Sequence, residues 1–174
     1  PAMHDLAHFV GRLHSAGFKA AVETQGSMWK GWLRKADRLC ISPKPPSSTM
    51  LTSEHKVQTE RFMLQALATR YEENKAPRWM LLKVVVFDEA DLDYAEGMHV
   101  SYPDVPVYLR AGNDAGKTVG NPEREDERVY GEVALGLLDK SQWLVQEVLQ
   151  RPALSDVIVQ SQYRVLLWGN VQGV

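Results

Sequence analysis

The stretch WMLLKVVVF, residues 79–87, decides the fold class of this chain. It is apolar at almost every position, as expected of a strand that is buried on both faces of a parallel sheet. Residues 53–71 before it and residues 90–99 after it are predicted to form helices. A buried strand between two helices is typical of βα units, so we predict an α/β fold with a mainly parallel sheet, open or barrel-like.

The same alternation continues towards both ends of the chain. Residues 111–122 are rich in Gly, Asn and Asp and are predicted to form a loop. Neither an internal repeat nor a domain boundary is visible, so we expect a single domain over residues 1–174. The other predicted elements are helices at residues 4–16, 29–36 and 123–150, and strands at residues 18–22, 38–42, 105–109 and 157–168, the last as one strand or a pair.

The composition is that of an ordinary soluble globular protein, with 44% hydrophobic and 24% charged residues. A net charge of -2 gives no sign of a nucleic-acid or anionic-membrane partner. No apolar run approaches the roughly 20 residues that span a bilayer, and no signal peptide is visible. One cysteine, Cys40, excludes an internal disulfide framework and fits the reducing cytoplasm, where we expect the protein to reside.

Polar side chains follow each predicted strand at the point where the strand ends. In parallel α/β folds, ligands bind at the carboxyl ends of the strands, where loops and helix N-termini supply hydrogen-bond donors. We therefore expect a binding site at this edge, although strands that simply end where polar loops begin would give the same pattern. The polar sets are Glu23 with Thr24, Ser42 with Lys44, Asp88 with Glu89, and Arg110 with Asn113.

One alternative function is a zinc hydrolase, because HDLAHFVGRLH at residues 4–14 has the spacing of a metzincin zinc signature. His4 and His8 would share one face of a helix, and a turn would bring in His14. The signature needs Glu as general base, and Asp5 is one methylene shorter. An amphipathic helix with solvated histidines is therefore the favoured interpretation.

A second alternative is a nucleotide hydrolase, because residues 111–118, AGNDAGKT, fit a loose phosphate-loop pattern that ends in Lys117. Asp88, at the end of an apolar strand, would then hold Mg²⁺. The acidic strand comes before the loop, however, which reverses the usual order, and Ala111 replaces the first glycine. A flexible loop at residues 111–118 is therefore the favoured interpretation.

Cys40 lies in an apolar stretch and is expected to be a small core residue.

The stretch WLRKADRLCISPKPPSS, residues 32–48, is the most distinctive. It resembles the 7-carboxy-7-deazaguanine synthase family, in which a strand ends in Ser-Pro-Lys followed by prolines and serines. The resemblance covers the whole chain, and its pieces come in the family's order. The other pieces are AGFKAAVETQG at 16–26, LLKVVVFDEADLDYAEGMH at 81–99, YPDVPVYLRAGN at 102–113 and VLLWGNVQGV at 165–174.

The resemblance implies a partial, modified (β/α) barrel with mainly parallel strands, lacking the N-terminal strands. The chain would be the C-terminal part of a single radical S-adenosylmethionine domain. The enzyme would be a lyase that converts 6-carboxy-5,6,7,8-tetrahydropterin to 7-carboxy-7-deazaguanine with loss of ammonia, for queuosine and other 7-deazapurines. Its cofactors would be S-adenosylmethionine, a 4Fe–4S cluster and Mg²⁺, and the family is often homodimeric.

The family's cluster-binding cysteine triplet and its Mg²⁺-binding Ser or Thr have no counterpart in these residues. Pro1 resembles the proline of the Gly-Gly-Glu/Asn-Pro motif that follows them in the family. We therefore expect a fragment without lyase activity of its own, because Cys40 cannot replace three thiolate ligands.

The resemblance also implies site residues at two strand ends. Arg110 stands where the family tends to have Gln, and a cation near the sulfonium is unfavourable unless it pairs with the methionine carboxylate or turns away. Arg164 stands where a His is common, and Gln25 where Asn or Ser is usual. The cofactor contacts would be Ser42, Pro43, Lys44, Arg110, Ala111, Gly112 and Asn113, with Thr24 a weaker candidate, and Val174 would reach the substrate.

Overall fold

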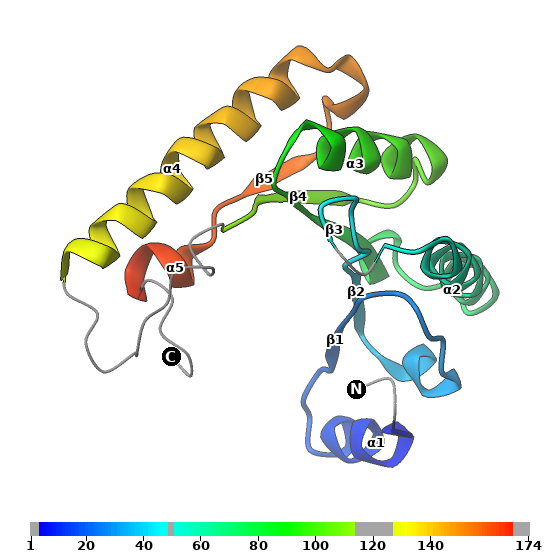
Figure 1. The fold of residues 1–174 in the computed structure, drawn as a ribbon. Helices are drawn as coiled ribbons and strands as arrows, with labels where there is room; N and C mark the ends of the chain where they lie inside the picture. Colours follow the sequence, from blue (N-terminus) through cyan, green and yellow to red (C-terminus); the bar gives the residue numbers. More distant parts are fainter. Residues whose placement is uncertain (1–3, 49–50, 114–126, 169–174) are drawn as a thin grey trace.

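The computed structural model describes residues 4–48, 51–113 and 127–168, and only the backbone of residues 127–132. Five parallel strands form one sheet, and their order in the sheet is their order along the chain, β1-β2-β3-β4-β5 (Figure 1). The strands are β1 Ala21–Thr24, β2 Arg38–Ile41, β3 Met80–Val86, β4 Val107–Ala111 and β5 Ile158–Gln160.

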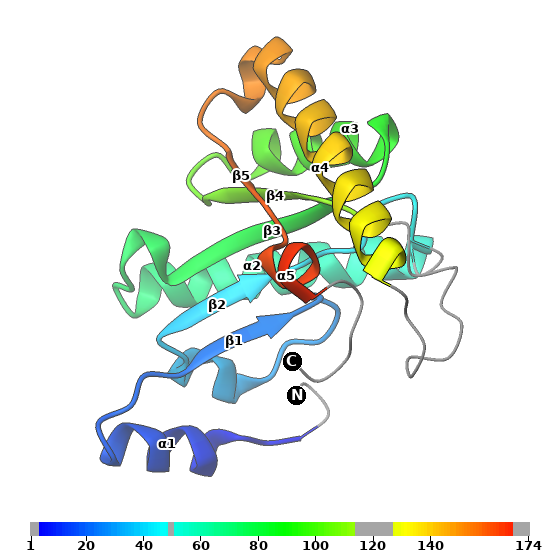
Figure 2. The same cartoon turned by 90° about the vertical axis from the view of Figure 1, so that its left-hand side faces the viewer.

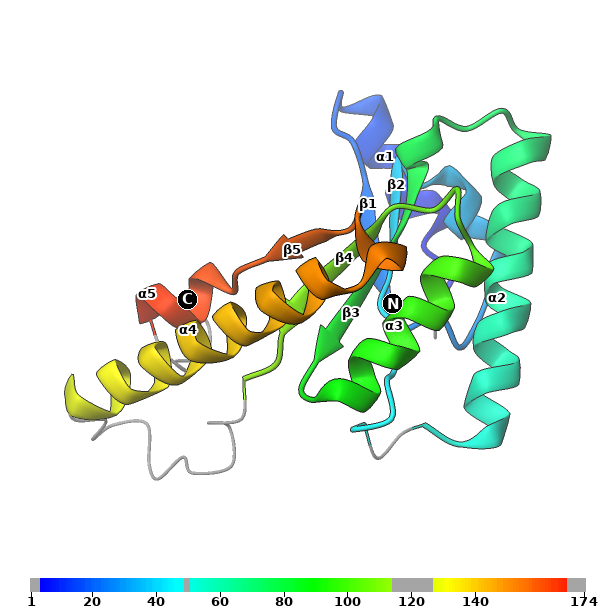
Figure 3. The ribbon, with the colours of Figure 1, turned by 90° about the horizontal axis from the view of Figure 1, so that it is seen from above.

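Helices connect these strands and gather on one side of the sheet. Because each crossover adds the next strand in the same direction, with no reversal of the order, α2, α3 and α4 lie on the same side (Figure 3). This arrangement is that of a partial (β/α) barrel and confirms the predicted fold class. The helices are α1 Ala7–Ser15, α2 Ser53–Glu72, α3 Glu89–Ser101, α4 Glu127–Gln150 and α5 Tyr163–Trp168, with short 3₁₀ turns at Gly31–Lys35, Pro77–Trp79 and Pro152–Leu154.

The core lies between the sheet and these helices. Alternate residues of β3, from Met80 to Val86, are completely buried in this core. The helices contribute one apolar stripe each, with Phe62 of α2, Leu92 of α3 and Leu144 of α4 among the buried side chains. Phe62 also meets Trp29 edge to face at 5.2 Å between ring centroids, which ties α2 to the segment after β1.

The other face of the sheet is only partly covered, and we call it the open face (Figure 2). Leu81, Lys83 and Val85 of β3 are half-buried there, so the prediction of a strand buried on both faces is wrong for this face. Helices α2, α3 and α4 lie on the opposite side, and a charged Lys83 is not accommodated in an apolar core without a partner. The register places Glu23 beside Cys40, and Arg110 beside Val85 and Gln160, on the same face.

β4 is displaced by two residues from the predicted 105–109, and two further strands differ more from their predictions. The strand predicted at residues 18–22 is displaced, because β1 begins only at Ala21, after the Ala20 N–H donates to the Asp37 carboxylate at 2.7 Å. The strand or pair predicted at residues 157–168 is wrong in its second half. β5 spans three residues, and α5 follows it, with Val165 buried on its inner side.

Gly26 provides a test of the packing between β1 and α2. Its φ is +79°, and an added Cβ would lie 2.8 Å from Cγ2 of Ile41. We expect Gly26→Ala to lower the free energy of unfolding by about 1–3 kcal/mol, because it combines backbone strain with overlap in a filled core. Urea unfolding followed by circular dichroism measures the change.

The matched control is Gly97→Ala, in the interior of α3, where an added Cβ would meet nothing within 4 Å. Alanine favours a helix over glycine by about 0.8–1 kcal/mol, so this variant should be equally or more stable than the wild type. Equal destabilisation by both substitutions would contradict the packing described for Gly26.

Candidate binding site at the carboxyl edge of the sheet

Two loops flank the carboxyl end of β3, and backbone hydrogen bonds extend the sheet into both. The Ser42 N–H donates to the Thr24 carbonyl, and the Gly112 N–H donates to the Val86 carbonyl, each at 2.7 Å. The first loop follows β2, and the second follows β4, so they lie on either side of β3 at one edge. The structure thus brings the two predicted segments, 42–44 and 110–113, to the same edge of the sheet.

The Asp91 carboxylate holds the first loop to the turn after β3. Asp91 lies in the first turn of α3 and is completely buried. One of its oxygens accepts the Ser47 N–H and the other accepts the Phe87 N–H, both at 2.9 Å. A carboxylate that receives two backbone donors makes strong, charge-assisted hydrogen bonds. This single side chain therefore fixes where the loop after β2 lies relative to β3.

Phe87 supports the second loop. A Cβ on Gly112 would overlap the Phe87 ring, so only glycine allows the backbone to lie this close. The ammonium of Lys140, on α4, lies 5.2 Å from the centre of the same ring. Ala111 is buried on the helix-covered face, so its side chain packs in the core, and only its backbone is available to a ligand.

The open face carries an ion pair near this edge. The Lys83 Nζ donates to Glu23 Oε1, and the side chains are 14% and 58% exposed, respectively. Lys83 is not among the site residues predicted from the sequence, although a single charge inside the apolar run LLKVVV is a usable signal. Glu23 is predicted to follow the end of a strand, whereas β1 includes it.

Arg110 lies on the same face, and its Nε is buried with no hydrogen-bond partner among the described residues. A buried donor without an acceptor costs free energy, which an acceptor on a ligand would recover. Cys40 also lies on this face and is half-buried, rather than in the core as expected. Burial raises the pKa of its thiol, and the Glu23 carboxylate raises it further, while Lys83 and Arg110 act in the opposite direction.

The remaining predicted residues lie in different places. Ser42 and Lys44 are half-buried beside the buried Pro43, and Asn113 is also half-buried. Thr24 lies beside Ile41 on the covered face, where its hydroxyl accepts the Gly26 N–H at 3.2 Å and shapes the turn. Its contact with a cofactor stays a prediction. Val174 lies outside the described residues.

The structure gives the zinc alternative no support. The His14 Nε2–H donates to the Asp37 carboxylate at 2.8 Å, and the His4 carbonyl accepts the Trp32 indole N–H. Within the described ranges, no group of three or more His, Cys, Asp or Glu residues could hold a metal ion.

For the nucleotide-hydrolase alternative, Asp88 caps the N-terminus of α3 by accepting the Asp91 N–H at 3.0 Å. The proposed phosphate loop lies mostly outside the described residues, from position 114 on. In the part of the chain that the structure describes, no helix is both long and apolar enough to cross a membrane.

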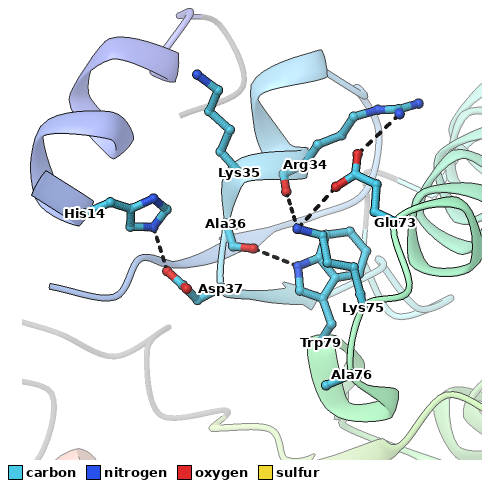
Figure 4. A pocket seen from close by; sticks show the side chains of 9 residues that line it. All are labelled: His14, Arg34, Lys35, Ala36, Asp37, Glu73, Lys75, Ala76 and Trp79. Carbon is cyan, nitrogen blue, oxygen red and sulfur yellow. Dashed lines mark hydrogen bonds and ion pairs between the residues drawn. The ribbon is translucent and has the colours of Figure 1, made fainter. Parts of the chain in front are cut away.

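A pocket of about 460 Å³ lies at the opposite end of the strands, where β2 and β3 begin (Figure 4). Its charged side chains engage one another: Lys75 contacts Glu73 at 3.3 Å, and His14 contacts Asp37. The Trp79 indole N–H donates to the Ala36 carbonyl at 2.7 Å. In parallel barrels the amino-terminal end serves stability, and we assign this pocket to that role.

Known proteins are similar in sequence to most of this chain. The chain is 40% identical to the 7-carboxy-7-deazaguanine synthase of Bacillus cereus over 162 residues. These residues make up 93% of this chain and 60% of the relative. The chain is a homologue of this enzyme. The 7-carboxy-7-deazaguanine synthase of Bacillus subtilis (strain 168) is 37% identical over 172 residues, 99% of this chain and 64% of the relative. The chain thus spans less than two thirds of the length of either 7-carboxy-7-deazaguanine synthase, and no family model matches it.

Substitution of Asp91 tests the anchor between the loop and the turn. Asp91→Ala leaves two backbone N–H groups without their acceptor, and we expect the free energy of unfolding to fall by about 2–5 kcal/mol. Urea unfolding gives the value. Asp88→Ala is the matched control: it removes a helix cap on the surface and should cost only about 1 kcal/mol. Losses of the same size in both variants would contradict the role assigned to Asp91.

Cys40 reports the electrostatics of the open face, since it is the one cysteine in the 174 residues. Its iodoacetamide labelling rate should rise with pH to a midpoint above the ordinary thiol pKa of about 8.5, because burial and Glu23 both disfavour the thiolate. Glu23→Gln removes a negative charge and leaves Lys83 free to stabilise the thiolate, so labelling at pH 8 should accelerate severalfold. A midpoint at or below the ordinary value would show that the thiol does not lie among these groups.

Proposed function

We propose that these residues form the S-adenosylmethionine-binding part of a radical lyase that makes 7-carboxy-7-deazaguanine. The similarity to two 7-carboxy-7-deazaguanine synthases extends over at least 93% of the chain. The observation that carries the proposal is the open face, where Glu23, Lys83 and Arg110 come from three different strands next to the carboxyl edge. Ligands of parallel α/β folds bind at this edge.

The residues at the edge fit the chemical groups of S-adenosylmethionine. Its methionine part ends in a carboxylate and an amino group, and its ribose offers two hydroxyls. The Arg110 guanidinium has a buried donor without a partner, and it would pair with the carboxylate, at a distance from the sulfonium. Backbone carbonyls of the loops at Ser42 and Gly112 would contact the rest of the cofactor, because their N–H groups are already donated to Thr24 and Val86.

The iron–sulfur cluster and Mg²⁺ do not fit the described residues. A 4Fe–4S cluster of this class is held by three cysteines, and these 174 residues contain Cys40 alone. When bound with a reduced cluster, S-adenosylmethionine supplies the hydrogen-abstracting radical. The part of such an enzyme described here binds and orients the cofactor and excludes water from one side of it. We therefore propose that these residues alone have no lyase activity.

The substrate of the proposed lyase is a carboxylated pterin, 6-carboxy-5,6,7,8-tetrahydropterin, which loses ammonia on conversion. Leu81 and Val85 are partly exposed on the open face and would offer an apolar surface to the flat ring. Lys83 lies between them along β3 and would attract the substrate carboxylate. We further propose a cytoplasmic enzyme that works as a homodimer.

A titration of the 174-residue chain with S-adenosylmethionine tests the proposal. We expect heat of binding by isothermal titration calorimetry and slower labelling of Cys40 when the cofactor covers the open face. Arg110→Ala should weaken binding at least tenfold, the loss expected when a carboxylate loses its charged partner. Arg78→Ala, in the 3₁₀ turn before β3 at the opposite end of the strands, is the control and should bind like the wild type.

Two results would contradict the proposal. The first is the absence of both heat and protection of Cys40 at millimolar cofactor, near the weakest affinity that such a site would have. The second is formation of 7-carboxy-7-deazaguanine by this chain alone after anaerobic reconstitution with iron and sulfide, which would show that the cluster ligands had been misjudged.

A further inference from the structure

The turn that joins α4 to β5 lies against α3 (Figure 3). At the start of this turn, one nitrogen of the Arg151 guanidinium donates to Asp93 Oδ1 at 2.5 Å and to Glu96 Oε2 at 3.0 Å. At its end, the His99 Nε2–H donates to Asp156 Oδ1 at 2.8 Å. Polar side chains thus hold both ends of the turn, and we call these residues the clasp.

Arg151 is the residue on which the clasp depends. Asp93, Glu96 and His99 follow one another at intervals of three residues, so they share one face of α3. Ion pairs between fully exposed side chains contribute little to stability. Arg151 differs from these, because only 16% of its side chain is exposed and two carboxylates accept its hydrogen bonds. Without the guanidinium, two like charges would face each other across less than one turn of helix.

Apolar contacts alone do not fix the direction in which the chain leaves this turn. Leu154, in the middle of the turn, is buried and anchors it, but the burial of apolar surface is non-directional. The strand that follows has one exposed and two half-buried residues, and among the described residues it pairs with β4 alone. Hydrogen bonds are directional, so we assign to the clasp the placement of β5 along β4.

Strand β5 lies beside Arg110. The register places Gln160 on one side of Arg110 and Val85 on the other, and the Arg110 Nε is buried. A guanidinium that neighbours already hold in place loses less conformational freedom when it binds an anion. A shift of β5 would open one side of Arg110 to water, and water weakens the attraction between opposite charges.

We propose that Arg151 is a positioning residue for S-adenosylmethionine: it fixes β5 through the clasp, and β5 holds Arg110 in place for the cofactor carboxylate. This inference rests on the proposed function. Arg151 precedes β5, whereas Gln160, the neighbour of Arg110, ends it. Arg151 therefore acts through the strand and not by contact with the cofactor.

Hydrogen exchange measured by mass spectrometry tests the first step without any cofactor. Arg151→Met removes the charge and keeps an unbranched apolar side chain, and we expect the amides of residues 157–160 to exchange about threefold faster or more. Asp93→Asn removes a charge on the other side of the same hydrogen bond and should change the exchange in the same direction. The matched control is Arg34→Met, which breaks an ion pair with Glu73 at the amino-terminal end of the strands and should leave residues 157–160 unchanged.

Calorimetric titration with S-adenosylmethionine tests the second step. Arg151→Met should weaken binding about fivefold or more, Arg151→Lys should recover part of this loss, and Arg34→Met should bind like the wild type. Because Arg151 acts through Arg110, adding Arg151→Met to Arg110→Ala should cause no further loss. A substitution that merely destabilised the fold would weaken binding in both backgrounds.

Three results would overturn the inference and leave the proposed function intact. They are unchanged exchange of residues 157–160 in both Arg151→Met and Asp93→Asn, unchanged cofactor binding by Arg151→Met, and an equal further loss of binding when Arg151→Met is added to Arg110→Ala. A wild type that does not bind S-adenosylmethionine would instead contradict the proposed function, whatever the exchange experiment shows.

Discussion

The candidate site depends on one buried carboxylate. Asp91 accepts two backbone N–H groups from segments 40 residues apart, one in the loop after β2 and one at the end of β3. The carboxylate comes from a helix whose own N-terminus is capped by Asp88, so loop, strand and helix share a single junction. The hydrogen bond from the Ser42 N–H to Thr24 fixes the start of the loop that carries Lys44, and Asp91 fixes its far end at Ser47. The site is therefore held from inside the fold.

The topology explains why the opposite face of the sheet can carry charges. Strands that follow one another in chain order place the connecting helices on one side, and this side forms the core. The other side is free of that packing, so Lys83 and Arg110 are tolerated in strands whose alternate residues are buried, and Glu23 of β1 pairs with Lys83 there. The same alternation thus yields both a stable core and a polar surface, and each residue of β3 belongs to one or the other.

The order of the strands and helices could be predicted from the sequence, because β3 and the neighbouring helices have strong local patterns. The limits of β1 could not, since they depend on Asp37, a tertiary contact from the segment before β2. The short apolar segment after β5 suits a helix as well as a strand, and periodicity alone does not decide between them. The sequence does not reveal the open face, because the residues of LLKVVV that lie on either face of the sheet are all apolar except Lys83. Ser42, Lys44 and Asn113 could be found from their positions at predicted strand ends and from resemblance to a family, whereas the anchor behind them, Asp91, carries no motif of its own.

The short first strand has a consequence for handling the protein. β1 pairs with β2 alone among the described residues, so its outer margin presents backbone donors and acceptors in an extended conformation. Another extended segment can pair with such a margin. The short length of β1, four residues, is what limits this pairing. We therefore expect the margin of β1 to be one place where isolated copies of these 174 residues associate, and a peptide that occupies this margin would block that association.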